Sequence, residues 1–230
     1  MTYTAYPAYK ESGVEWLGQI PETWEIVPLF PYMEEQDIKA IGQGITDVLS
    51  LSYGNLILRD VENNFGLRPE SFDTYQVIKP GNIILRLTDL QNDHKSLRVG
   101  LAKQLGIITS AYVNLKIKSQ FEPQFVYYLL HCYDLLKVFY GLGGGVRQSM
   151  KYNDLKHLPL CLPPLSEQRA IAAFLDRETA RIDTLIAKQQ RMIELLKERR
   201  SALITAAVTG KIDVRAAGAA REEEEAIHAG

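Results

Sequence analysis

The sequence has few of the residues that mark secreted, disulfide-bonded or metal-binding proteins. Only 2 of its 230 residues are cysteines, Cys132 and Cys161, and neither has a cysteine or histidine at ligand spacing. Because both lie in apolar patterns, we expect buried thiols rather than a disulfide or a zinc site. The 4 histidines are scattered along the chain, so we assign no metal.

Long apolar runs are also missing. No stretch reaches the roughly 18 apolar residues that a membrane span needs. The first residues, MTYTAYPAYKESG, contain no basic segment followed by an apolar core, as a signal peptide would. We therefore expect a cytoplasmic protein with no membrane partner.

Catalytic motifs are absent as well. The glycine-rich stretch GLGGGVRQSMKYNDL (141–155) lacks the phosphate-loop fingerprint, and Val146 takes the last glycine position of the dinucleotide fingerprint. There is no GxSxG, no HExxH and no pair of carboxylates followed by a lysine, as a metal-dependent nuclease would have. Binding without catalysis or a bound cofactor is therefore the simpler interpretation. A nuclease is a third possibility, which metal-dependent cleavage by the isolated chain would support.

The net charge is small, but the charged residues are unevenly distributed along the chain. The net charge is −2, whereas residues 164–215 hold 10 basic and 7 acidic side chains and residues 216–230 hold 1 and 4. A globally basic chain would itself indicate nucleic-acid binding, so in this chain any DNA binding must come from local patches. One such window, residues 86–118, has only Asp89 and Asp93 as acids and contains the basic residues Arg86, Lys95, Arg98, Lys103, Lys116 and Lys118.

We expect the DNA-binding side chains to come from this window and from the glycine-rich stretch. Glycines let hydrogen-bond donors approach a phosphate backbone, although the same glycines also suit a plain flexible connector. Ordinary surface charge is likewise the alternative for each basic residue. The predicted DNA-binding residues are Arg86, Lys95, Arg98, Lys103, Arg147, Gln148 and Ser149.

Short β-branched and aromatic runs broken by turn residues fill the first 160 or so positions. The predicted strands are residues 45–52, 55–59, 75–78, 82–88 and 111–118. In the last of these, Val113, Leu115 and Ile117 alternate with polar residues, which predicts one core face and one basic face in water. The KPGN segment at 79–82 predicts a tight turn.

One helix is predicted within this region. Residues 124–141 (QFVYYLLHCYDLLKVFYG) repeat apolar side chains at helical spacing up to a stop at Gly141. The apolar positions are Phe125, Leu129, Cys132, Leu136 and Phe139.

A long helix is predicted after two prolines. Pro163 and Pro164 fix the exit from the domain, Ser166 suits an N-cap, and Glu167 suits the helix dipole. Steps of four and three residues then predict a coiled-coil seam with polar interruptions at Glu178, Gln189 and Arg199. The apolar seam residues, predicted to bind a partner helix, are Ile171, Leu175, Ile182, Leu185, Met192, Leu196 and Leu203.

These patterns predict an α+β protein with a strand-rich domain followed by a long coiled-coil-forming helix. We place the strand-rich domain, which contains the candidate DNA-binding residues, at residues 1–163 and the long helix, with its seam for a partner helix, at 164–208. Residues 209–230, which contain TGKID and then EEEE, have the composition of a disordered tail.

Three segments carry a resemblance to a known family. They are residues 9–29 (YKESGVEWLGQIPETWEIVPL), 145–190 (including LPLCLPPLSEQRAIAAFLD) and 198–215 (ERRSALITAAVTGKIDVR). Together they closely resemble the DNA-specificity subunit of type I restriction-modification systems. Residues 30–140 are similar only in their pattern of short strands and a helix.

The resemblance implies a non-catalytic subunit that binds double-stranded DNA and directs partner subunits to it. The partners implied are adenine methyltransferase subunits, which carry S-adenosylmethionine, and a restriction subunit, an ATP-driven translocase. The family's usual subunit has two recognition domains and two antiparallel helices, whereas this sequence contains one of each, so the resemblance implies a homodimer that reads an interrupted palindrome. The alternative is a stand-alone coiled-coil DNA-binding adaptor or regulator, a remnant half-subunit that does not support methylation.

Overall fold

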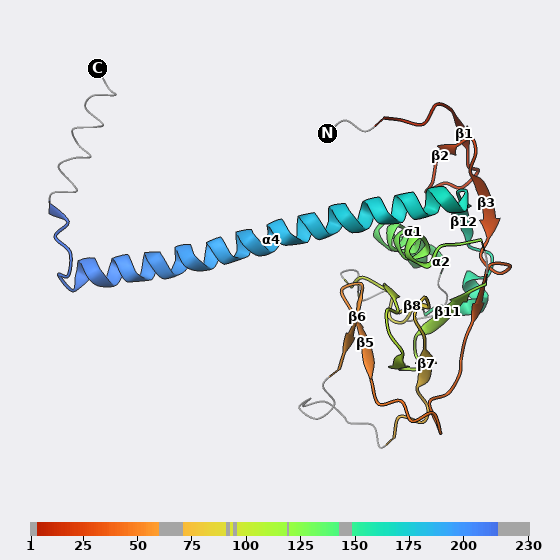
Figure 1. Ribbon diagram of the computed structural model, residues 1–230, viewed down its shortest axis with the longest axis horizontal. Helices are drawn as coiled ribbons and strands as arrows, with labels where there is room; N and C mark the ends of the chain where they lie inside the picture. The colour runs from red at the N-terminus through yellow and green to blue at the C-terminus, as the bar shows by residue number, and fades with distance from the viewer. Residues whose placement is uncertain are drawn as a thin grey trace. The chain divides into compact units, whose positions relative to one another are not determined.

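The computed structural model describes residues 4–59, 71–90, 93, 96–118, 120–142 and 149–215 (Figure 1). Its contacts divide the chain into two units, residues 1–174 and residues 175–230. The first unit holds all the strands and the beginning of the last helix. The second unit holds the remainder of that helix and the C-terminal segment.

Twelve short strands and four helices are present in the described part of the chain. The strands are β1 (Tyr9–Glu11), β2 (Gln19–Pro21), β3 (Glu25–Pro28), β4 (Met33–Glu35), β5 (Leu49–Ser52), β6 (Asn55–Leu58), β7 (Gln76–Ile78), β8 (Ile83–Leu85), β9 (Val99–Leu101), β10 (Gly106–Ile108), β11 (Val113–Ile117) and β12 (Pro159–Leu162). The helices are α1 (Pro123–Leu135), α2 (Val138–Leu142), α3 (Tyr152–Leu155) and α4 (Leu165–Val208).

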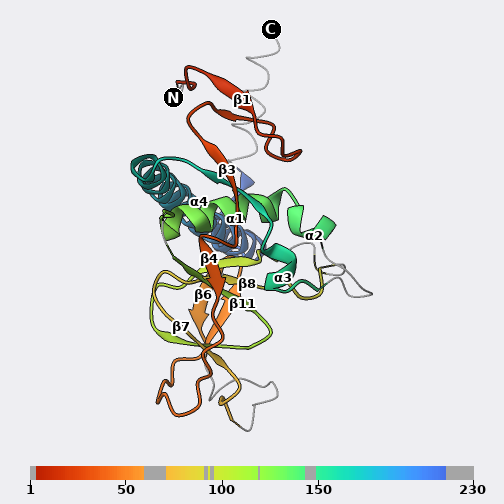
Figure 2. The same ribbon diagram turned by 90° about the vertical axis from the view of Figure 1, so that its right-hand side faces the viewer.

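A four-stranded antiparallel sheet in the order β4-β11-β8-β9 forms the centre of the first unit. Both faces of this sheet are covered. Ile83 and Leu85 of β8 point into the main core, which α1 and the β3–β12 pair also line, whereas Ile84 points into a second cluster with residues of β5, β7 and β10. Figures 1 and 2 show α1 between the first turns of α4 and this sheet.

The strand predictions are confirmed, and one detail of them is wrong. Each of the five predicted segments contains a strand, and the KPGN segment turns with the Asn82 N–H donating to the Lys79 carbonyl at 3.0 Å. The polar face of β11, however, is not entirely in water. Asn114 is 0% exposed and donates its side-chain N–H to the Val77 carbonyl at 3.1 Å, because a second layer of strands covers this face.

The predicted helix over 124–141 is two helices. Lys137 adopts a left-handed backbone conformation, with φ of 62°, and this separates α1 from α2. Of the predicted apolar positions, Phe125 and Phe139 are buried, but α1 also buries Val126, Leu130 and Tyr133, which the prediction left out. Leu136 is half exposed and Cys132 is exposed, so the expectation of two buried thiols holds for Cys161 alone. Apolar residues occur on adjacent faces of this segment, so periodicity alone could not select the buried one.

Helix α4 confirms the long helix, with 44 residues in one run. It begins at Leu165, one residue before the predicted cap Ser166, and the Pro164 carbonyl accepts the N–H groups of Glu167 and Gln168. It ends at Val208, where Gly210 adopts a φ of 72° and the Lys211 N–H donates to the Ala206 carbonyl at 2.8 Å. This is the Schellman arrangement that glycine permits at a helix end.

Over the described segments, none of the helices combines the length and the apolar character needed to cross a bilayer.

Candidate nucleic-acid interface

The predicted basic patch is divided by the register of β8 and β9. These strands are antiparallel, with Leu85 opposite Val99 and Ile83 opposite Leu101. Arg86 and Arg98 therefore emerge at one end of the pair. Lys103 follows β9 and emerges at the other end, so the patch forms two separate sites.

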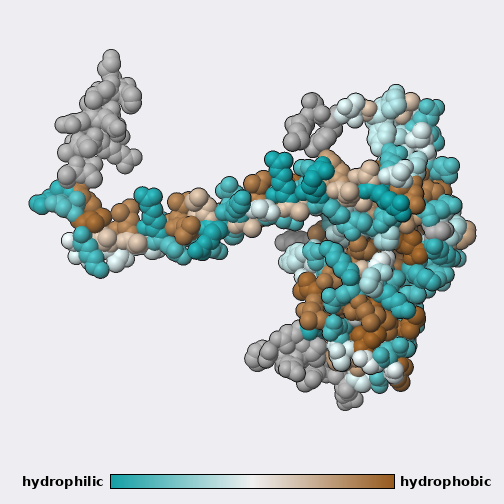
Figure 3. All heavy atoms as spheres, viewed as in Figure 1, coloured by the Kyte–Doolittle hydropathy of each residue, from teal (hydrophilic) through white to brown (hydrophobic). Residues whose placement is uncertain are grey.

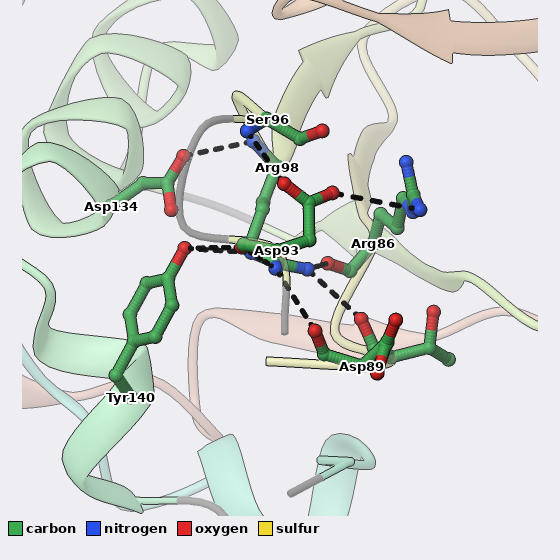
Figure 4. Close-up of polar contacts among 8 residues, drawn as sticks. Arg86, Asp89, Asp93, Ser96, Arg98, Asp134 and Tyr140 are labelled. Carbon is green, nitrogen blue, oxygen red and sulfur yellow. Dashed lines mark hydrogen bonds and ion pairs between the residues drawn. The ribbon is translucent and has the colours of Figure 1, made fainter. Parts of the chain in front are cut away.

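Arg98 is inside the domain, with a relative exposure of 0%. Its guanidinium donates to the carbonyl oxygens of Arg86 at 3.1 Å, Thr88 at 2.9 Å and Asp89 at 3.4 Å, and also to that of Asp93 (Figure 4). All of these carbonyls belong to the connection between β8 and β9. The connection is therefore folded around a buried cation.

Helices α1 and α2 complete the enclosure of Arg98 (Figure 4). The Tyr140 hydroxyl accepts the Arg98 Nε–H at 3.1 Å and donates to the Asp93 carbonyl at 3.1 Å. Asp134 Oδ2 accepts the backbone N–H of Arg98 at 2.8 Å. Burial raises the pKa of the Asp134 carboxyl, a change that the N–H and the positive charge of Arg98 oppose.

The prediction that Arg98 faces DNA is therefore wrong. The N–H groups of this guanidinium donate to acceptors inside the domain, so none remains to bind a phosphate. Its burial is tolerable only because these donors are satisfied. A signal for this lay in the sequence, because Arg98 stands between Leu97 and Val99 at the start of a buried strand.

Arg86 remains at the surface beside the end of the glycine-rich stretch. Its guanidinium forms an ion pair of 3.7 Å with Asp93, and its side chain is 32% exposed. The Met150 N–H donates to the Leu87 carbonyl at 2.9 Å, which brings the exposed Ser149 next to this connection. Lys95, Arg147 and Gln148, the other residues predicted here, lie outside the described residues.

Lysines that the sequence separates meet at the other end of the β8–β9 pair. Lys79, Lys116 and Lys118 line a hollow of about 410 Å³, together with Gln36 and Asn82. Its apolar wall consists of Pro80, Ile117, Phe121 and Pro123. We call this site the lysine hollow.

Lys103 emerges beside the lysine hollow. Its neighbour Ala102 donates its N–H to the Asn82 carbonyl at 2.8 Å and accepts the Gly81 N–H at 2.9 Å, so the two segments run together. Glu34 lies near Lys116 at 3.4 Å and Lys118 at 3.6 Å. The lining of the hollow thus contains three lysines and no acidic side chain, and Glu34 pairs with two of these lysines.

The second unit presents an apolar stripe along α4. The stripe residues Ile182, Leu185, Met192, Leu196 and Leu203 are each 51% to 58% exposed, and Figure 3 shows apolar side chains at the surface of this helix between hydrophilic ones. Exposed side chains at Ile186, Ile193 and Ile204, absent from the predicted seam, widen the stripe. Leu175 is half-buried.

Ile171 departs from the predicted seam. It belongs to the first unit and packs against the core of that unit, next to the buried Ala172. The turn of α4 that contains Ile171 packs on the first unit. The part of the stripe that is open to a partner therefore begins after this turn.

The chain's thiols and acidic groups offer little chemistry. Burial raises the pKa of the Cys161 thiol to about 11, and partial desolvation by neighbouring atoms raises the pKa of the more exposed Cys132 thiol, so both are weak nucleophiles. Where side chains are described, no group of three or more histidine, cysteine or carboxylate residues is arranged to hold a metal ion.

Comparison with known proteins gives consistent results. The family described as type I restriction modification DNA specificity domain matches residues 102–195. The putative type I restriction enzyme MjaX specificity subunit of Methanocaldococcus jannaschii is 26% identical over 212 residues, covering 85% of this chain and 48% of the relative. The type I restriction enzyme EcoBI specificity subunit of Escherichia coli is 43% identical over 53 residues, 23% of this chain and 11% of the relative.

Solved structures agree in fold. The HsdS subunit from Thermoanaerobacter tengcongensis aligns with a TM-score of 0.51 at 18% identity, over 89% of this chain and 48% of that one. A chain from a study of complex assembly and conformational transition of the type I R-M system aligns with a TM-score of 0.59 at 18% identity, over 86% and 48%. The chain spans about half the length of the relatives it matches.

Replacing Arg98 with Met should destabilise the domain severely. The change leaves the carbonyls of the β8–β9 connection without donors in a buried site, which should lower the free energy of unfolding by about 3 kcal/mol or more. Arg98→Lys, whose ammonium reaches fewer of these carbonyls, should be intermediate. The exposed Lys103→Met is the control and should change stability by less than about 0.5 kcal/mol. Urea unfolding followed by tryptophan fluorescence measures all three, and equal losses in Arg98→Met and Lys103→Met would contradict the buried-cation assignment.

Proposed function

We propose that this chain is a DNA-specificity subunit of a type I restriction-modification system and that its first unit reads one half of a bipartite DNA target, a proposal that the matched specificity domain and the similar specificity subunits support. The second unit then pairs with the α4 helix of another copy and sets the distance between two half-sites. The chain itself is non-catalytic. It directs adenine methyltransferase subunits, and a restriction subunit where one is present, to the target, and S-adenosylmethionine and ATP bind to those partners.

The observation that carries this proposal is the apolar stripe on α4. A run of half-exposed isoleucine, leucine and methionine side chains along a helix of 44 residues is unfavourable in water and suits burial against a second helix. A second copy supplies the same stripe, and an antiparallel pair would carry one recognition domain at each end.

DNA contacts in this proposal centre on the lysine hollow, with Arg86 and Ser149 forming a second contact at the far end of the β8–β9 pair. The side chains of Lys116 and Lys118 are 50% and 39% exposed, so their ammonium groups can reach a phosphate while their stems pack on the apolar wall. Phosphate contacts of this kind set affinity and orientation, whereas base contacts set the sequence that is read.

The target should be an interrupted palindrome. Two identical domains related by a two-fold axis read the same half-site on opposite strands, and a fixed helix pair gives the gap a constant length. Mapping methylated adenines in cells whose sole specificity polypeptide is this chain tests the proposal. An asymmetric motif would exclude the homodimer. Absence of methylation, together with DNA binding by the isolated chain, would instead identify a DNA-binding adaptor or regulator.

Removing two lysines of the hollow should weaken DNA binding at every sequence. In Lys79→Gln/Lys118→Gln, we expect the slope of log affinity against log salt to become shallower by roughly 0.9 for each phosphate that the variant no longer neutralises. The ratio of affinities for target and non-target duplexes should stay unchanged. The control, Lys10→Gln/Lys156→Gln, removes the same charge from the same unit outside the hollow. Equal slopes in the two double variants would show that the hollow does not contact DNA.

Self-association should depend on the apolar stripe. Each isoleucine or leucine buried in a helix pair contributes about 1.5 to 3 kcal/mol, so Ile182→Lys/Leu185→Lys should give a monomer. Thr184→Lys/Ala187→Lys adds the same charges to the same two turns on the other face, and it should remain associated. Sedimentation velocity of the isolated chain compares them. If the stripe variant sediments as the wild type does, the partner surface lies elsewhere.

A further inference from the structure

Gln168, in the first turns of α4, is a polar side chain with 0% exposure. Its Oε1 accepts the backbone N–H of Glu122 at 2.8 Å. Its Nε2 donates to the carbonyls of Gln120 at 2.9 Å and Pro163 at 2.8 Å. The amide oxygen and both amide hydrogens are therefore used, and all of these contacts lie within the first unit.

Each contact holds a different segment. Glu122 is the N-cap residue of α1 and has no side-chain cap of its own. Gln120 adopts a left-handed conformation, with φ of 62°, which is unfavourable for a residue other than glycine. Pro163 directly follows β12. One side chain on α4 thus fixes the residue after β12, the N-cap residue of α1 and the left-handed residue that precedes α1.

Neighbouring side chains add contacts from other directions. Glu167 accepts the Trp24 Nε1–H at 3.1 Å and the Tyr6 hydroxyl hydrogen, and burial together with this carboxylate raises the pKa of Tyr6 to about 12. Arg169 forms an ion pair of 3.2 Å with Glu122. With Ala172 buried in the core, the first turns of α4 are held to the domain by both polar and apolar contacts.

We propose that Gln168 is a positioning residue for the gap between half-sites, an inference that rests on the proposed function. Apolar contacts are non-directional and let a helix turn or tilt on its domain, whereas three hydrogen bonds at fixed geometry do not. The effect of a small tilt is large, because a helix of 44 residues is about 66 Å long at 1.5 Å per residue. A change of roughly 10° at its start moves its far end by about 11 Å, or about three base pairs of 3.4 Å.

Gln168→Met, which keeps the length of the side chain and removes its hydrogen bonds, tests this inference. Binding is measured on duplexes that carry the half-sites identified by mapping methylated adenines in cells with the wild-type chain. The half-sites are separated by the wild-type gap or by gaps one or two base pairs shorter or longer. The variant should lose about fivefold of its preference for the wild-type gap, on the scale of one hydrogen bond. Its discrimination against a changed base within a half-site should be retained. Gln19→Met, the same replacement at an exposed position of β2 outside α4 and the lysine hollow, is the control and should keep both preferences.

The outcomes separate this inference from the proposed function. A wild-type chain without any gap preference contradicts the proposed function itself. A wild-type chain with a gap preference that Gln168→Met retains, or a variant that loses gap and half-site discrimination to the same degree, overturns the positioning role. Trp24→Phe removes the bond from Nε1 to Glu167 and keeps an aromatic ring beside Tyr6, and it should relax the gap preference in the same direction but less. Should Gln168→Met fail to fold, an unchanged gap preference in Trp24→Phe overturns the inference.

Discussion

The first unit depends on a positive charge that is buried away from solvent. A buried guanidinium is tolerable only when its donors are satisfied, and Arg98 finds its acceptors in the connection between β8 and β9. That requirement shapes the connection, and it also explains the neighbouring helices, since α1 supplies Asp134 and α2 supplies Tyr140. The left-handed residue Lys137 between the two helices lets Tyr140 point back at the same site. Strand pairing, helix break and loop conformation thus share one cause.

Charge at the surface depends on the same strand pair. The β8–β9 register sends Arg86 to one end and Lys103 to the other, and the second end gains Lys79, Lys116 and Lys118 from other strands and turns. A chain with a net charge of −2 can therefore carry a strongly positive site. For a DNA-reading domain this has an advantage, because non-specific attraction stays local while the rest of the surface repels the duplex.

The sequence was sufficient for some of these features and insufficient for others. β-Branched runs between turn residues located the strands, and the pair of prolines with the apolar seam located α4, because these signals are local. The burial of Arg98 was not predictable in this way, since it depends on carbonyl groups that assemble only when the connection folds. The lysine hollow was missed because Lys79 and Lys116 are far apart in the chain and meet through strand pairing. Gln168 was missed because its sequence neighbours do not distinguish a glutamine that holds three segments from one in solvent.

The groups that Gln168 contacts have a consequence for how such a protein can change over generations. Its three partners, the Glu122 N–H and the carbonyls of Gln120 and Pro163, are main-chain atoms. The guanidinium of Arg98 likewise bonds to main-chain carbonyls of the β8–β9 connection. Side chains that make the proposed DNA contacts can therefore be replaced without removing the main-chain groups that Gln168 and Arg98 bind. New target sequences can evolve on this scaffold while the mechanical parts of the molecule remain the same.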